Sequence, residues 1–395
     1  MIRWAPLWSL ALVAALLAAF FLLAPGIAER RMNVVDGGPL PEVSDEARAL
    51  HASLTVVDLH ADTLLWQRDM LDRAERGHVD VPRLADGNVA LQVFSSVTKS
   101  PAGLNNEVNS ADARDDITLL AIGQLQPVAT WTSLLQRTLF HAAKLRQAVA
   151  QSQGGLFQVT DNADLAHVLT ARATPQRPIG VMLSVEGLHD LEGDAANLAR
   201  LYDTGVRMAG LTHFFDNQLA GSMHGEEKGG LTPFGRQVMR DMERRGMIVD
   251  IAHCSHQCVA DVLAAARRPV VSSHGGVQAT CPGNRNLTDE EIRGVAATGG
   301  LIGIGYWDSA VCDISPEGIV RAMAHVRNLV GIEYVALGSD FDGTVTTRFD
   351  TSHLVQITQA MMRAGFTESE IRAVMGGNAL RVIGAGIVPQ PELPA

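Results

Sequence analysis

The sequence predicts an α/β protein with the (β/α)8 or TIM-barrel fold, and two observations support this prediction. Short apolar runs rich in β-branched residues alternate with longer segments of helical periodicity, which is typical of parallel βα units. Eight such units fit into roughly 340 residues, and eight is the number that closes a barrel. A doubly wound open sheet would show the same alternation, so the count of eight favours the barrel.

The predicted strands follow one another with one large interruption. They are 54–58, 90–95, 179–185, 206–211, 247–251, 269–272, 301–304 and 334–337. The polar and helical stretch 100–166 indicates an insertion between the second and third strands. After the last strand, 352–364 and 368–383 are predicted to be closing helices, and Thr367 is expected to cap the second.

Composition divides the chain into four segments. These are an N-terminal membrane anchor or signal segment (1–31), a linker rich in Gly, Pro and acidic residues (32–46), the barrel domain (47–386) and a disordered tail (387–395).

The first segment is long enough to cross a hydrocarbon core of about 30 Å, because no side chain from Trp4 to Ala28 is charged. Its apolar run exceeds the roughly 7–15 residues of an ordinary signal peptide, which favours an uncleaved anchor. Gly26 and Ala28 nevertheless form a small-residue pair suited to cleavage. Arg30 and Arg31 also weaken the positive-inside argument for an outer C-terminus.

Charge and cysteine content exclude two classes of protein. The formal net charge of -11 argues against a surface that follows phosphates, so we expect no nucleic-acid partner. The four cysteines form no CxxC pairs, so a structural zinc finger is not indicated. Cys254 and Cys258 are expected to be buried thiols. Cys281 and Cys312 both follow strand ends, and the sequence leaves open whether they form a disulfide.

Seven residues of metal-ligand type lie at or just beyond the ends of predicted strands. A barrel places these ends on one rim, which is where barrel enzymes carry their active sites. His60 and Asp62 are two residues apart, so both side chains point to the same side of an extended backbone. The full set comprises His60, Asp62, Glu186, His213, His253, His274 and Asp340.

Each of these residues alone has an ordinary structural explanation, but their joint placement does not. Burying several ionisable groups together without a cation would cost several kcal/mol per unpaired charge. A metal site removes that cost. Imidazole and carboxylate ligands without thiolate suit Zn²⁺, with Mn²⁺ or Co²⁺ as substitutes.

Ordered motifs from about Leu54 to Ile383 resemble those of the membrane dipeptidase family, the M19 metallopeptidases. The motifs are VVDLHADTL, HVDVPRLADGNVALQVFS, SVEG, LTHFFDN, DIAHCS, SSHGG, NRNLTDEEI, GSDFDG and EIRAVMGGNALRVI. Gly275 in SSHGG departs from the family pattern, which often has a hydroxyl residue there.

The resemblance implies two Zn²⁺ per subunit. His60 and Asp62 would bind one ion, His253 and His274 the other, and Glu186 would bridge them. A shared carboxylate and hydroxide can hold two cations about 3.5 Å apart. Related amidohydrolase barrels instead use an HxH pair and a carboxylated lysine. None of the lysines, which are Lys99, Lys144 and Lys228, lies at a strand end.

The resemblance also implies a binuclear zinc dipeptidase that hydrolyses L,L and L,D dipeptides through a metal-bridging hydroxide. Asp340 would be the general base and then the acid, and His213 would stabilise the oxyanion. Arg285 in NRNLTD would bind the substrate carboxylate, because its planar fork suits that group. Tyr306 is a further candidate for substrate binding.

Other activities remain open at this point. Hydrolysis of N-acyl amino acids, dehydropeptides or β-lactams needs the same carboxylate beside an amide, and a non-hydrolytic binding module is a more distant alternative. The resemblance implies a homodimer. We expect a bacterial inner-membrane protein with its catalytic domain in the periplasm, or an exported protein if the N-terminal segment is cleaved.

Overall fold

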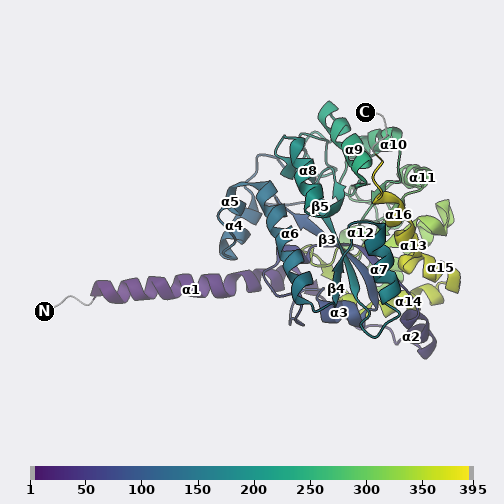
Figure 1. The fold of residues 1–395 in the computed structure, drawn as a ribbon, viewed down its shortest axis with the longest axis horizontal. Helices are drawn as coiled ribbons and strands as arrows, with labels where there is room; N and C mark the ends of the chain where they lie inside the picture. The colour runs from purple at the N-terminus through teal and green to yellow at the C-terminus, as the bar shows by residue number, and fades with distance from the viewer. Residues whose placement is uncertain (1–4, 391–395) are drawn as a thin grey trace.

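The computed structural model describes residues 5–390, with side chains from residue 10 onward. A closed barrel of eight parallel strands forms the centre of the domain, and helices cover it on the outside (Figure 1). Pairing of β3 with β5 and of β2 with β10 closes the barrel. The barrel strands are β2 (Val56–Ala61), β3 (Val89–Val97), β5 (Ile179–Glu186), β6 (Val206–Gly210), β7 (Ile248–Asp250), β8 (Val271–Ser272), β9 (Leu301–Ile304) and β10 (Val335–Leu337).

All eight predicted strands are confirmed, with ends that differ by a few residues. The predicted sixth strand begins later, at Val271, because Pro269 has no N–H to donate to a ladder. The first continues to Ala61, which forms a bridge with Phe341 beyond β10. The sequence did not predict β4 (Leu156–Gln158), which lies in the insertion and adds a short parallel strand to β5.

Alternate residues of each strand fill the barrel, as the two-residue period of a strand requires. Apolar side chains from all eight barrel strands form one interior cluster, together with residues of the last helix. This cluster includes Val57, Leu59, Leu91, Val93, Met182, Met208, Ile248, Val271, Leu301, Ala336, Val382 and Ile383. Residues of the opposite parity pack outward against the surrounding helices.

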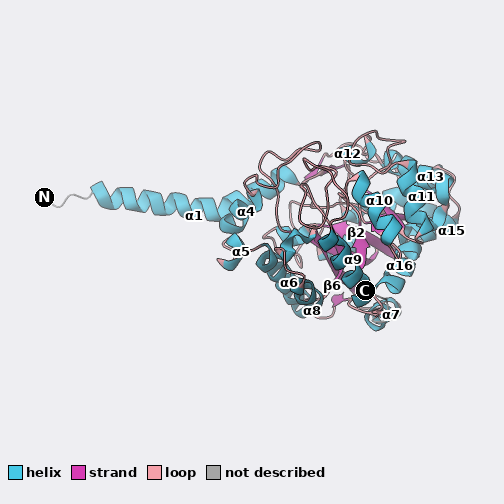
Figure 2. Ribbon diagram, turned by 90° about the horizontal axis from the view of Figure 1, so that it is seen from above, coloured by secondary structure: helices cyan, strands magenta, loops and turns pink. Residues whose placement is uncertain are grey.

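Helices surround the strands, and most begin at a side-chain cap that satisfies free N–H groups (Figures 1 and 2). The cap predicted at Thr367 is confirmed, and the structure shows it to be a capping box with Glu370 as partner. The helices outside the insertion are α2 (Asp45–Ala52), α3 (Val81–Asp86), α8 (Ala196–Asp203), α9 (Pro233–Arg245), α10 (His256–Ala265), α11 (Asp289–Ala297), α12 (Asp308–Val311), α13 (Pro316–Val330), α14 (Val355–Arg363), α15 (Glu368–Arg372) and α16 (Asn378–Gly386).

The predicted final helix is divided into two by a wider turn at Ala373–Gly377. Gly376 lies directly against the backbone oxygen of Thr55, where a Cβ atom would collide. The close approach of this turn to the start of β2 therefore explains both the glycine and the interruption.

The insertion contains four helices and β4. The helices are α4 (Asp116–Gly123), α5 (Ala129–Thr132), α6 (Leu134–Gln151) and α7 (Asn162–Ala171). Helix α6 packs against β3 on the outside of the barrel, and α4 contacts the N-terminal helix.

The N-terminal helix α1 (Ala5–Met32) projects from the barrel as a single long rod (Figures 1 and 2). Within residues 5–390, one segment is long and apolar enough to span a membrane, Leu10–Met32, with a mean hydropathy of 2.5. The predicted linker contains a short strand, β1 (Val34–Val35), that pairs in parallel with β11 (Thr346–Thr347). The helix is therefore fastened to the loop that follows β10.

The tail predicted from residue 387 contacts the domain up to residue 390, and 391–395 lie outside the described residues. Ile387 is 1% exposed because it continues the apolar face of α16. The backbone N–H of Gln390 donates to the Arg244 carbonyl.

Candidate active site

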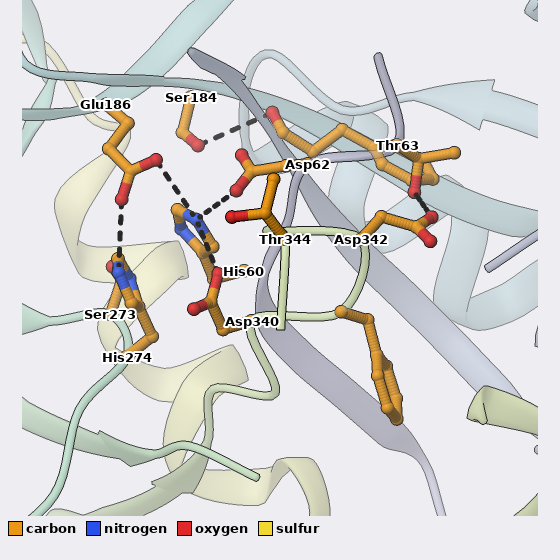
Figure 3. Close-up of polar contacts among 12 residues, drawn as sticks. His60, Asp62, Thr63, Ser184, Glu186, Ser273, His274, Asp340, Asp342 and Thr344 are labelled. Carbon is orange, nitrogen blue, oxygen red and sulfur yellow. Dashed lines mark hydrogen bonds and ion pairs between the residues drawn. The ribbon is translucent and has the colours of Figure 1, made fainter. Parts of the chain in front are cut away.

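The strands bring all seven predicted ligand-type residues to one rim of the barrel, and all seven are buried. His60 lies within β2 and Asp62 directly after it, while Glu186 is the last residue of β5. The others follow β6, β7, β8 and β10, in the order His213, His253, His274 and Asp340. Figure 3 shows five of the seven around one small volume.

Glu186 is at the centre of the cluster. Its Oε1 lies 2.8 Å from His253 Nε2 and 3.1 Å from His274 Nε2. Its Oε2 lies 3.5 Å from His213 Nε2 and 3.8 Å from His60 Nε2. The same carboxylate therefore faces ligand atoms on both sides, as a bridging ligand must.

His60 connects the other two carboxylates to this centre. Its Nε2 lies 3.5 Å from Asp62 Oδ2 and 3.8 Å from Asp340 Oδ1. Three groups have ligand atoms within 4.8 Å of one another: His60 with Asp62 and Glu186, Glu186 with His213 and His253, and His60 with His274 and Asp340. Two of these groups share Glu186.

Unpaired polar atoms show that the cluster fits a metal. His60 Nε2 and Asp62 Oδ1 are buried and have no hydrogen-bond partner among the described residues. A buried group of this kind costs free energy unless another ligand satisfies it. Imidazole nitrogens and carboxylate oxygens at this spacing are the donor set that divalent zinc, manganese or cobalt accepts.

Burial and the close charges also shift the pKa values of the site residues. Burial, followed by the neighbouring Asp62, raises the pKa of Glu186 well above its ordinary value. Burial raises the pKa of Asp340 to about 8. Burial lowers the pKa of His60, but the carboxylates of Asp62 and Glu186 outweigh it and bring the value to about 10. Positive charge from cations would favour the ionised carboxylates and the neutral imidazoles.

Two site residues occupy the left-handed backbone region, which non-glycine residues rarely adopt. His253 has φ 67° and Asp340 has φ 60°. Such strain costs roughly 1–3 kcal/mol per residue and persists where surrounding structure imposes it. The sharp turns after β7 and β10 therefore aim both side chains into the site.

Hydrogen bonds behind the cluster orient the histidine rings. His274 Nδ1 lies 2.9 Å from Ser273 Oγ, and that hydroxyl donates to Asp250. His213 Nδ1 lies 3.2 Å from the carbonyl oxygen of Lys99. These contacts fix which ring nitrogen faces the centre.

Arg285 is buried at the edge of the cluster. Its Nη2 donates to the His274 carbonyl over 2.9 Å, and its guanidinium lies 5.2 Å from the Trp307 ring centroid. A cavity of about 740 Å³ is lined by Arg285 together with Asp62, Glu186, His213, His253 and Asp340. The guanidinium therefore lies in the same cavity as the ligand-type side chains.

Tyr306 is placed differently. Its ring is 0% exposed and packs 5.5 Å from Phe341 and 5.6 Å from Phe349. Its hydroxyl has no hydrogen-bond partner among the described residues. The structure thus places Tyr306 in the packed wall near the site, and a contact with substrate stays a prediction.

Other acidic and histidine residues of the rim have supporting contacts. Asp342 accepts hydrogen bonds from Thr63 Oγ1 and from Arg68, and it does not join the three ligand groups. His224 Nδ1 lies 2.7 Å from the Asn106 carbonyl, and its ring stacks on Phe214. His189 and His256 contact Thr98 and Glu291.

Sequence reasoning did not single out Lys99, Trp307 or Ser273. Each contacts one residue of the site, and the sequence alone does not show these contacts. The one available signal was position, since Ser273 and Trp307 both lie within two residues of a strand end or of a selected residue.

The disulfide left open by the sequence is present: Cys281 and Cys312 are bonded, with 5.3 Å between their Cα atoms. It joins the loop after β8 to the end of α12. Cys254 and Cys258 are buried free thiols, as predicted.

Comparison with known proteins agrees with this geometry. Residues 44–387 match the model of the family described as membrane dipeptidase, peptidase family M19. This chain belongs to the membrane dipeptidase family. It is therefore a metallopeptidase of the dipeptidase type with the fold of M19 dipeptidases, and its own residues form clusters that could hold metal ions.

Curated relatives of this membrane dipeptidase include two fungal proteins. Dipeptidase aclJ of Aspergillus oryzae is 30% identical over 351 residues, which span 83% of this chain and 77% of the relative. Dipeptidase tcpJ of Claviceps purpurea is 28% identical over 319 residues, which span 78% and 69%.

Solved structures share the fold. The probable dipeptidase PvdM from Pseudomonas aeruginosa has a TM-score of 0.72 at 18% identity, covering 87% of this chain and 98% of that one. A metallopeptidase from Rhodobacter sphaeroides, liganded with a phosphinate mimic of the dipeptide L-Ala-D-Ala, has a TM-score of 0.68 at 22% identity and covers 84% and 99%.

Proposed function

We propose that this membrane dipeptidase uses two zinc ions to hydrolyse L,L and L,D dipeptides. The observation that supports the proposal most strongly is that Glu186 faces His60 with one carboxylate oxygen and both His253 and His274 with the other, in the cavity that also contains Arg285. A carboxylate-binding group beside a candidate bimetal centre suits a substrate whose free carboxylate is one residue from the scissile bond.

In the proposed centre, His60 and Asp62 would hold one ion, His253 and His274 would hold the other, and Glu186 would be shared between them. Bound zinc ions would polarise the scissile carbonyl and acidify the attacking water. The protein's own groups then supply orientation and proton transfer.

Asp340 acts as the proton carrier in this proposal. Its carboxylate lies beside His60, 3.8 Å from Nε2, and lines the cavity. It takes a proton from the attacking water and returns it to the nitrogen of the leaving amine as the C–N bond breaks. One carboxylate therefore completes the proton balance of the reaction.

His213 stabilises the carbonyl oxygen as it gains negative charge. Because Nδ1 contacts a carbonyl oxygen, which only accepts, the ring carries a proton on Nδ1. Its Nε2 can then donate to substrate only when the ring is protonated. Burial lowers the pKa of His213 to about 4, so the developing oxyanion must favour the protonated ring.

Arg285 binds the substrate carboxylate and sets the length of peptide that fits. Its planar fork can form two parallel hydrogen bonds to a carboxylate. A longer peptide would place an amide at Arg285 and lose that pairing. The Rhodobacter sphaeroides structure with a mimic of L-Ala-D-Ala supports the extension to L,D dipeptides.

We also propose that α1 anchors the enzyme in a bacterial inner membrane with the catalytic domain in the periplasm. Five large apolar side chains of the insertion are exposed, which suits a face close to lipid. They are Leu104, Val108, Leu119, Leu125 and Val128. Helix α4, which carries one of them, contacts α1.

The test is steady-state hydrolysis of Gly-Ala and Gly-D-Ala, with their N-acetylated forms, by metal-depleted and zinc-reloaded full-length enzyme. We expect zinc-dependent cleavage of the free dipeptides. Preferential cleavage of the acetylated forms would instead identify an N-acyl amino acid hydrolase, and no cleavage of either would contradict the proposal.

A further inference from the structure

We infer that the last turns of α1 form the pocket for the N-terminal side chain of the dipeptide, so that a helix outside the family domain sets substrate selectivity. This inference rests on the proposed dipeptidase function. The family match begins at residue 44, and α1 ends at Met32.

The cavity extends from the candidate metal centre to α1. Arg285 and Trp307 line one part, and Glu186 and Asp340 line the centre. Apolar residues of α1 and α4 also line the cavity: Phe20, Ala24, Pro25, Ala28, Ile117 and Leu120. Ile117 packs with Leu65 and Trp66, which follow Asp62 in the chain, so this apolar part of the wall adjoins the Asp62 side of the centre.

The position of α1 against the domain is specified by buried polar contacts. Glu29 is 1% exposed and forms ion pairs with Arg68 and Arg76. The side chain of Asn33 accepts a hydrogen bond from the Thr344 N–H over 2.9 Å. Pairing of β1 with β11 continues this attachment. Removing one partner from a buried ion pair leaves an uncompensated charge, so these contacts hold the helix end in place.

Only one face of the helix end meets the domain. Pro25 and Glu29 are buried and Ala28 is partly buried, at the spacing of helical turns. Ile27, one residue from Ala28, is 49% exposed and does not line the cavity. The contact face is thus distinct from the outward face.

The direction of the substrate follows from Arg285. With its carboxylate at Arg285 and its carbonyl at Glu186, a dipeptide extends its N-terminal residue toward Asp62 and the apolar wall. That wall combines small side chains of α1 with Ile117 and Leu120 of α4, a helix that contacts α1. Such a pocket suits an apolar side chain such as Leu or Phe.

Helix α1 can be tested by filling the pocket in the full-length enzyme in detergent. Ala28→Trp adds bulk on the cavity face, and Ile27→Trp is the matched control on the outward face. For each variant, kcat/KM is measured on Gly-Ala, Ala-Ala, Leu-Ala and Phe-Ala, and on Ala-Leu and Ala-Phe.

Ala28→Trp should lower kcat/KM for Leu-Ala and Phe-Ala by about 10-fold or more relative to kcat/KM for Gly-Ala in the same variant. Ala-Leu and Ala-Phe should follow Gly-Ala, because their large side chain lies on the Arg285 side. If the added bulk displaces the helix instead, kcat/KM for Leu-Ala and Phe-Ala should rise relative to Gly-Ala. That result would also show that α1 forms the wall of the pocket.

An unchanged size series in Ala28→Trp, or the same change in Ile27→Trp, would overturn the inference. If the unmodified enzyme cleaves none of the dipeptides, the proposed function fails first. If the unmodified enzyme cleaves them but Ala28→Trp leaves the relative kcat/KM values of the substrates unchanged, the inference alone fails.

Discussion

At the scale of single residues, substitutions of Glu186 and Asp340 should separate metal binding from proton transfer. Glu186 faces three histidines within 3.5 Å, whereas Asp340 lies 3.8 Å from His60 and within 4.8 Å of His274. We expect Glu186→Gln to reduce bound zinc below two ions per chain, because the amide presents one oxygen where the carboxylate presents two. Metal analysis of the purified protein measures this.

The matched variant Asp340→Asn should retain both ions and lose about 10²–10⁴-fold in kcat, because general acid–base catalysis has that magnitude. Two ions per chain in Glu186→Gln, or wild-type kcat in Asp340→Asn, would contradict the assigned roles.

His141 of α6 predicts how stability depends on acidity. It is 1% exposed, its Nδ1 lies 2.8 Å from Ser96 Oγ, and burial lowers its pKa to about 3. Below about pH 6.5, His141 therefore binds a proton in the unfolded chain but stays neutral in the folded chain. The free energy of unfolding is unaffected by His141 above that pH and decreases as the pH falls, by about 2 kcal/mol at pH 5.

Denaturant unfolding of wild type and His141→Asn at pH 8 and pH 5 measures this effect. The difference at pH 8 gives the packing cost of the substitution, and the wild type should lose about 2 kcal/mol more than the variant between the two values. Parallel losses would show that His141 is not the titrating group. The site histidines are present in both proteins and cancel in the comparison.

At the scale of elements, the disulfide connects two rim loops. Cys281 lies in the loop that carries Arg285, and Cys312 ends α12. A link across 31 residues of sequence is worth about 3–4 kcal/mol on the loop-entropy model. We expect Cys281→Ser with Cys312→Ser to lower the free energy of unfolding by that order and to raise KM through a more mobile Arg285.

Reductant should reproduce the effect in wild type and leave the double variant unchanged. Cys254→Ala supplies a control at a buried thiol that is not cross-linked. Equal unfolding of wild type with and without reductant would argue against a stabilising disulfide.

The elements that were predictable from the sequence are those with strong local patterns. The eight strands alternate with helices, so the alternation of short apolar runs with helical periodicity was enough to predict the fold. His60, Glu186, His253 and Asp340 lie at strand ends, so their positions were enough to predict the cluster on the rim. What was missed depends on contacts distant in sequence. β4 has three residues, and Gly376 interrupts a helix only because Thr55 lies against it.

At the scale of the whole molecule, the sequence left open whether α1 is kept or removed. Cleavage after Ala28 would place a new ammonium group on Glu29, whose carboxylate is buried against Arg68 and Arg76. It would also separate the domain from Ala24 and Pro25, which line the cavity. Both losses favour an intact helix.

We therefore expect the mature enzyme to keep α1 and to remain in the membrane fraction after high-salt and carbonate washes, since a segment of mean hydropathy 2.5 resists both. Intact mass or N-terminal peptide analysis of the membrane-bound protein measures retention. Recovery of a soluble protein that starts at Glu29 would show that the segment is a cleaved signal. Glu29→Gln tests whether the helix end is held by its ion pairs. Its anchoring should be unchanged, because every apolar side chain of α1 is kept. Protease access to Arg30 and Arg31 should increase, because the helix end loses its ion pairs.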